Sequence, residues 1–154
     1  MKILLCILML FIGMTGFSQE KLGDSEVQVT IQEFFEAFHK QDSIGLKKVA
    51  HPTISMQSIM TDSTGTSTIK NESYAEFLKA IVSIPTSTKF EERLHGFDIR
   101  VNGALASAIT PYSFYVNGKL SHCGVNSFEL FKSAEGWKII YIVDTRVKEN
   151  CDNP

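Results

Sequence analysis

The sequence predicts an α+β domain in which helices of the N-terminal half cover one face of a curved, mostly antiparallel sheet. Apolar residues recur at three- and four-residue steps between residues 25 and 40, which is the period of an amphipathic helix. From residue 89 onward apolar and polar residues alternate, which is the period of a strand. Asn102-Gly103 and Asn117-Gly118 divide this second part, and Asn-Gly is the strongest short signal for a β-hairpin.

The N-terminal half is predicted to contain three helices and one strand. Ser43 is expected to cap a short helix from Ile44 to Val49, and a strand follows from Ile54 to Met60. Asn71 is expected to cap the third helix, Glu72 to Val82. The first helix covers residues 25–40, and its apolar face comprises Val27, Ile31, Phe34, Phe35 and Phe38.

The C-terminal half is predicted to be a ladder of long antiparallel strands. The two Asn-Gly turns and a slightly longer loop from Ser133 to Gly136 connect them. The strands are expected at residues 89–101, 104–117, 119–132 and 137–147.

The charge balance excludes a protein that binds nucleic acid through overall charge. The chain has 154 residues and a net charge of −2, which suits one domain. Residues 1–18 hold a single charged residue, Lys2, so the rest of the chain carries 14 basic and 17 acidic residues. Neutralising phosphates requires a basic surface, and this balance does not supply one.

The N-terminus has the layout of a secretory signal peptide, with Lys2 followed by an apolar run from Ile3 to Ile12. That run is too short to span a bilayer, which takes about 20 residues. We expect residues 1–18 to be removed near Ser18, and the product to be periplasmic or secreted without a stable membrane anchor. The alternative is an N-terminal anchor that stays attached. Residues 19–24 would form a short flexible lead, 25–147 the domain and 148–154 a C-terminal tail.

Removal of the signal would leave two of the three cysteines, Cys123 and Cys151, because Cys6 lies in the apolar run. In an oxidising compartment these two form either a disulfide or two free thiols, and their spacing does not decide between the alternatives. No CxxC, HExxH or paired-histidine spacing occurs. We therefore expect no metal site and no cofactor.

Five short motifs resemble one known superfamily. They are Phe34-Phe35-Glu36-Ala37-Phe38, the stretch from Asp98 to Ala106, Tyr112-Ser113-Phe114-Tyr115, Ser121-His122-Cys123-Gly124, and Gly136-Trp137-Lys138-Ile139 leading to Asp144-Thr145. Together they resemble the nuclear transport factor 2-like superfamily, and within it an exported bacterial branch that carries a lumazine-binding label. The resemblance implies a cone-shaped α+β barrel that encloses one pocket. It implies no particular reaction, because isomerases, dehydratases and cyclases share this fold with proteins of no known chemistry.

Strand alternation sorts the side chains that would line such a pocket. On 119–132, His122 and Asn126 share a face with the expected core residue Phe128. Tyr112 and Phe114 share a face on 104–117, and His95 shares the face of the apolar residues on 89–101. The candidate ligand-binding residues are therefore Tyr112, Phe114, His122, Asn126 and His95.

The last strand is apolar on both faces. Alternation places Trp137, Ile139, Tyr141 and Val143 inward and Asp144 on the opposite face, so that a β-bulge would be needed to turn Asp144 inward. A sheet that is apolar on both faces needs both covered. We expect a homodimer through the outer face, in line with the resemblance, and the alternative is a helix or the tail folded over it.

The sequence is compatible with three functions and does not decide whether the protein is an enzyme. The first is a pocket for a small, partly apolar molecule. The second is a lyase or isomerase of a small carbonyl compound, with His122 as general base, Asp144 orienting it and Tyr112 donating to an oxyanion. The third is a non-catalytic accessory protein that acts through its outer face. A lone strand histidine is more often structural, which weighs against the second.

Overall fold

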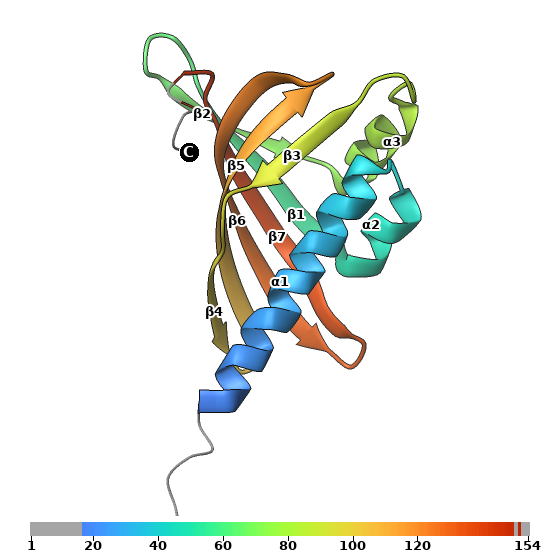
Figure 1. Cartoon of the computed structure of the whole chain (residues 1–154), viewed down its shortest axis with the longest axis vertical. Coiled ribbons are helices and arrows are strands. Elements are labelled where there is room, and N and C mark those ends of the chain that lie inside the picture. The colour runs from blue at the N-terminus through green and yellow to red at the C-terminus, as the bar shows by residue number, and fades with distance from the viewer. Residues whose placement is uncertain (1–16, 150, 152–154) are drawn as a thin grey trace, which may run out of the picture.

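The computed structural model describes residues 17–149 and 151. In this part of the chain three helices pack on one curved, unclosed sheet of seven strands (Figure 1). The predicted α+β class is confirmed. The elements in chain order are α1 (Phe17–His39), α2 (Ser43–Val49), β1 (Ala50–Thr61), β2 (Ser67–Glu72), α3 (Tyr74–Ser83), β3 (Phe90–Leu94), β4 (Asp98–Asn102), β5 (Leu105–Val116), β6 (Lys119–Ser133) and β7 (Gly136–Arg146).

The strands are ordered β2-β1-β7-β6-β5-β3, and β4 also pairs with β5. All pairs are antiparallel except β1 with β7, which run parallel. Helix α1 lies along the face that we call the inner face of the sheet, and contacts β3, β4 and β7 (Figure 1). Helices α2 and α3 lie beside one end of α1 (Figure 1).

Helix α1 begins at Phe17, earlier than the predicted start. Residues 1–16, which hold most of the predicted signal peptide, lie outside the described residues. The expected flexible lead, residues 19–24, is helical instead. Gly23 lies against the side chain of Val101, and α1 packs on β4 here, which accounts for the longer helix. No helix of the described chain is long and apolar enough to cross a membrane.

Both predicted helix caps are displaced by one or two residues. Asp42, not Ser43, caps α2, because its carboxylate accepts hydrogen bonds from the backbone N–H groups of Ile44 and Gly45, both at 3.0 Å. Ser73, not Asn71, precedes α3. Asn71 stays in β2, where it pairs with β1.

The predicted strand 89–101 is broken into β3 and β4, and this break reverses the expected faces of β3. Leu94 pairs with Tyr112 and Asp98 with Ile109. Residues 95–97 therefore lie opposite only residues 110–111 of β5, and within this break Gly96 has a φ of +138°. Glu92 and Leu94 are therefore partly buried on the inner side. Arg93 and His95, predicted to face inward, are exposed.

A β-bulge in β7 places the side chain of Asp144 on the inner face of the sheet, as the alternation requires. Glu129 pairs with Tyr141 but Leu130 pairs with Ile139, which leaves Ile140 as the extra residue. Beyond the bulge Ile142 and Asp144 are buried on the inner face. Tyr141 and Val143, predicted to face inward, lie on the outer face instead.

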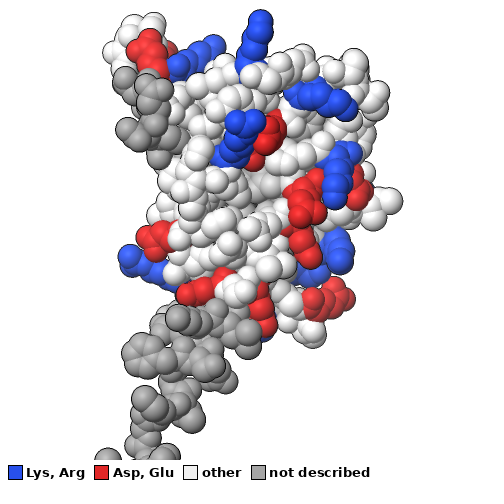
Figure 2. Space-filling model, in the orientation of Figure 1, with Lys and Arg blue, Asp and Glu red and all other residues white. Residues whose placement is uncertain are grey.

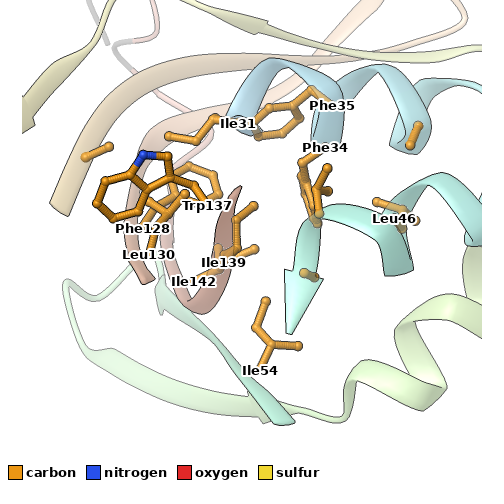
Figure 3. Close-up of a cluster of buried hydrophobic side chains, with 14 of the residues drawn as sticks. Ile31, Phe34, Phe35, Leu46, Ile54, Phe128, Leu130, Trp137, Ile139 and Ile142 are labelled. Carbon is orange, nitrogen blue, oxygen red and sulfur yellow. The ribbon is translucent and has the colours of Figure 1, made fainter. Parts of the chain in front are cut away.

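The hydrophobic core lies between α1 and the inner face. Ile31, Phe34 and Phe35 of α1 point toward Phe128 and other buried side chains of β6 and β7 (Figure 3). Burying each such side chain contributes roughly 1.5–3 kcal/mol. Toward the start of β6 the inward residues change from apolar to polar, as the alternation predicts. The core residues labelled on β6 and β7 are Phe128, Leu130, Trp137, Ile139 and Ile142.

Candidate functional site

Four neighbouring strands bring a row of buried polar residues onto the inner face, beyond the hydrophobic core. In the pairing of the strands, Thr110 of β5 is opposite Asn126 of β6, Asn126 is opposite Asp144 of β7, and Asp144 is beside Ser58 of β1. All four residues are buried. The row places an amide, a carboxylate and two hydroxyls in a region that water reaches poorly.

Asp144 is the centre of this row. Its carboxylate accepts hydrogen bonds from the Ser58 hydroxyl at 2.6 Å, from the Tyr112 hydroxyl at 3.3 Å and from Arg146 Nε at 2.6 Å. A second Arg146 nitrogen, Nη2, donates to Ser58 Oγ at 3.0 Å. Asp144 and Arg146 therefore form an ion pair with further hydrogen bonds, as a buried carboxylate requires. The Arg146 side chain is 42 % exposed, so solvent reaches the cluster from its side.

Tyr112 is fully buried beside Asp144 and stays protonated. Burial, followed by the negative charge of Asp144, raises the pKa of its phenol. Its hydroxyl also lies 3.0 Å from the backbone oxygen of Thr145. Tyr112 is directly opposite Gly124 in the β5–β6 pair. The phenol is thus a fixed hydrogen-bond donor.

Glu92 belongs to this cluster, and the alternation did not predict it. Its Oε1 accepts a hydrogen bond of 2.7 Å from the side-chain nitrogen of Asn126. The pKa of the carboxyl is raised to about 7, chiefly by burial; the Asn126 hydrogen bond lowers the pKa, the charge of Asp144 raises it and the charge of Arg146 lowers it. The backbone N–H of Glu92 donates to Nε2 of His39 on α1 at 2.8 Å. Glu92 therefore titrates in the neutral pH range.

The His122 ring lies between two aromatic residues of β5. Its centroid is 5.8 Å from that of Tyr112 and 4.9 Å from that of Phe114. Burial, then the charge of Arg146, lowers the pKa of the imidazole, so it is mostly neutral at pH 7. In the described chain its hydrogen-bond partner is the hydroxyl of Ser121, at 3.2 Å, and not Asp144. The expected orientation of His122 by Asp144 is therefore absent among these contacts.

His95 lies away from the other predicted ligand-binding residues. It is exposed, and its Nε2 is 2.9 Å from the hydroxyl of Ser113, which alternates with Tyr112 along β5. The break between β3 and β4 turns its side chain to the outer side. The structure thus brings together Tyr112, Phe114, His122, Asn126 and Asp144, adds Glu92, Ser58 and Arg146, and leaves out His95.

Half-buried aromatic rings adjoin the polar cluster. The Phe38 ring centroid is 4.9 Å from that of Phe90 and 6.3 Å from that of Phe114, and Phe90 and Phe114 are 6.2 Å apart. Phe77 stacks on Phe38 at 6.0 Å and on Tyr74 at 6.2 Å. The Tyr74 hydroxyl is buried without a hydrogen-bond partner in the described chain, and burial raises its pKa to about 12. The aromatic group offers apolar contacts next to Glu92 and His122.

Two hollows in the structure lie apart from this cluster. One, of about 350 Å³, is bounded by α1 and the β6–β7 hairpin and includes Glu26, Lys132 and Trp137. The other, of about 490 Å³, lies between β1 and the start of α3 and includes Met56 and Tyr74. Neither includes the residues hydrogen-bonded around Asp144.

Cys123 and Cys151 form a disulfide, which decides between the two alternatives that the spacing leaves open.

The described residues contain no group of three or more His, Cys, Asp or Glu side chains able to hold a metal ion. On the face shown in Figure 2, basic and acidic side chains lie among one another, and no extended basic area is present there.

Comparison with known proteins identifies the fold. No protein-family model matches the chain, and no protein of curated function is similar to it in sequence. Among solved structures, a protein of unknown function from Mycobacterium tuberculosis is similar with a TM-score of 0.70 and 11 % identity, over 91 % of this chain and 80 % of that one.

Two further structures carry the name of the superfamily. A nuclear transport factor 2-like superfamily protein from Salmonella enterica has a TM-score of 0.63 and 17 % identity, over 87 % of this chain and 98 % of its own. A "putative dehydratase" of that family from Streptomyces avermitilis has a TM-score of 0.59 and 15 % identity, over 83 % and 98 %. The chain therefore has the nuclear transport factor 2-like fold, as its motifs suggest. Identities this low establish the fold alone.

Proposed function

We propose that the protein binds a small, partly apolar molecule on the inner face of its sheet. The observation that carries this proposal is the placement of the polar cluster of Glu92, Asn126 and Asp144 directly beside the half-buried rings of Phe114 and His122. Small-molecule sites combine apolar walls with a few fixed polar groups. Here the phenylalanines would supply the wall and the cluster would fix the orientation.

Thermal-shift screening of the purified protein with small aromatic and alicyclic compounds tests this proposal, because a ligand that binds only the folded state raises the melting temperature. His122→Ala should weaken binding of any hit at least several-fold. His95→Ala is the matched control, since that ring lies on the other side of the sheet. The proposal fails if no compound stabilises the protein, or if both variants affect binding equally.

A second candidate function, a lyase or isomerase of a small carbonyl compound, is favoured by one observation. Glu92 has a pKa near 7, and the protonated Tyr112 phenol belongs to the same cluster. An acid–base group works best with a pKa near the working pH. The sequence-based candidate for the base is His122, and its lowered pKa leaves a neutral ring able to accept a proton. Turnover of a bound carbonyl compound that is lost in both His122→Ala and Glu92→Gln would support catalysis.

We also propose that the protein is exported and that residues 1–18 are removed. Support comes from the basic start and the short apolar run, and from the Cys123–Cys151 disulfide, a bond typical of oxidising compartments. Immunoblotting of cell fractions together with N-terminal sequencing is the test. A membrane-bound product that retains residues 1–18 would contradict export.

A further inference from the structure

The charges around Glu92 are unbalanced. Asp144 and Arg146 pair with each other, with the Nε to Oδ2 distance at 2.6 Å, so that their charges largely cancel. His39 and His122 are mostly neutral at pH 7 because burial lowers both pKa values. The side-chain partner of Glu92 in the described chain is the uncharged Asn126. In the described chain the Glu92 carboxylate therefore forms no ion pair, and the cation whose charge acts on it, Arg146, is already paired with Asp144.

The surroundings of Glu92 are aromatic. Phe90 precedes it by two residues on the same side of β3, and Phe114 is its direct partner on β5. Phe38 of α1 completes a group of three rings whose centroids lie 4.9 to 6.3 Å apart. Faces of aromatic rings attract cations, by about 0.5–1 kcal/mol at exposed sites and about 2 kcal/mol or more where water is excluded. Glu92 and these three residues are half-buried rather than sealed.

We propose that the ligand of the inner face is an organic cation, whose protonated nitrogen pairs with the Glu92 carboxylate while its apolar part lies against Phe38, Phe90 and Phe114. This inference rests on the proposed function and specifies its ligand class. A cation would supply the missing counter-charge and use the aromatic rings. An anion would be repelled by the carboxylates of Glu92 and Asp144, and the cation that acts on Glu92, Arg146, is already paired. A neutral carbonyl compound would instead accept a hydrogen bond from protonated Glu92. Its affinity would therefore fall as the pH rises, whereas the affinity of a cation would rise.

Four probes of similar size separate these cases: 2-phenylethylamine, 2-phenylethanol, phenylacetate and acetophenone. Calorimetric titration at neutral pH is expected to show that the amine binds at least tenfold more tightly than each of the others. Glu92→Gln should weaken the amine at least tenfold while keeping an oxygen for Asn126 to donate to. Glu91→Gln is the matched control, because Glu91 is exposed on the other side of β3, beside Arg93. It should leave the affinity unchanged.

The pH dependence gives an independent measurement. The groups around Glu92 from the elements packed against it are His39 of α1, Tyr112 of β5, Asn126 and His122 of β6, and Asp144 and Arg146 of β7. Glu92 has a pKa of about 7, so the fraction ionised rises about tenfold between pH 6 and pH 8. The amine affinity should rise by about that factor. Binding near pH 7 should release on the order of half a proton, measured by titration in buffers of different ionisation enthalpy.

The outcomes separate the inference from the function on which it rests. If acetophenone or the alcohol binds more tightly than the amine, or if binding strengthens as the pH falls, the organic cation is excluded while the binding function stands. If none of the four probes binds, both proposals are overturned. If Glu92→Gln proves unfolded by circular dichroism, proton release by the unmodified protein still decides, because a cation that does not pair with Glu92 releases none from it.

Discussion

The hydroxyl of Tyr112 on β5 donates a hydrogen bond of 3.0 Å to the backbone oxygen of Thr145 on β7, across the intervening strand β6. The residue between them on β6 is Gly124, the direct partner of Tyr112. A side chain at this position would collide with the Thr145 backbone, since an added Cβ would lie only 1.8 Å from its carbonyl oxygen. Gly124 therefore permits the contact that fixes the phenol of the candidate site.

Gly124→Ala is expected to destabilise the fold by about 2–4 kcal/mol, because the backbone of β7 must move to admit the methyl group. Urea unfolding followed by circular dichroism measures this change. Gly23→Ala is the control. Its added Cβ would be 3.5 Å from Val101, an ordinary contact, and alanine favours a helix by about 1 kcal/mol over glycine. Equal stability of the two variants would contradict the proposed collision.

Tyr112→Phe should cost about 1–2 kcal/mol of stability, because the ring stays while the O–H that is shared between the Thr145 backbone oxygen and the Asp144 carboxylate is lost. Tyr115→Phe serves as the control, since the Tyr115 side chain lies on the other side of the sheet, where it contacts the exposed Arg93. It should change the free energy of unfolding by less than about 0.5 kcal/mol. A neutral effect of Tyr112→Phe would show that its hydroxyl bonds do not contribute to stability.

The raised pKa of Glu92 predicts how stability depends on pH. In the folded protein the carboxyl keeps its proton up to a pKa of about 7, against an ordinary value of 4.5 for glutamate in an unfolded chain, so the folded state binds more protons between these values. Its contribution is fully present below about pH 4.5 and is lost as the pH rises through 7. The loss is on the order of 3 kcal/mol.

The difference in unfolding free energy between wild type and Glu92→Gln, followed from pH 4 to pH 8, isolates this contribution. Wild type should lose stability relative to the variant as the pH rises. His39 and His122 have lowered pKa values and act in the opposite direction, but they are common to both proteins. A difference that does not vary with pH would show that folding does not raise the pKa of Glu92.

Alternation along the sequence predicts the inward faces of Tyr112, His122 and Asn126 because β5 and β6 pair without interruption from Leu105 to Phe114. Glu92 and Asp144 lie beyond irregularities that shift alternation by one residue, at Gly96 and at Ile140 respectively. A break or bulge has no periodic signal of its own. The pattern therefore shows that Asp144 can face inward only if the strand contains a bulge, but it does not show that the bulge exists. Ser58 joins the cluster through the pairing of β1 with β7, which sequence distance conceals, and Arg146 follows Asp144 by two residues on the same strand.

The disulfide predicts a definite thiol count. The unreduced, unfolded protein should show no free thiol if residues 1–18 have been removed, and one, from Cys6, if they remain. Cys151→Ser should lower stability by about 2–4 kcal/mol, because the bond closes a loop with a sequence separation of 28 residues. Urea unfolding of the variant beside wild type measures this loss. Two more free thiols than expected in the unreduced wild type would contradict the bond.

The outer face of the sheet predicts a homodimer. Leu105 and Ile109 of β5 are 49 % and 46 % exposed there, and an exposed apolar sheet face marks an interaction site. Sedimentation at micromolar concentration should show a dimer for wild type and a folded monomer for Ile109→Lys, because a buried lysine without a partner opposes association. Ile69→Lys is the control: Ile69 is 59 % exposed on β2 at the far edge of the sheet, so the dimer should persist. A wild-type monomer under these conditions would exclude self-association through the outer face.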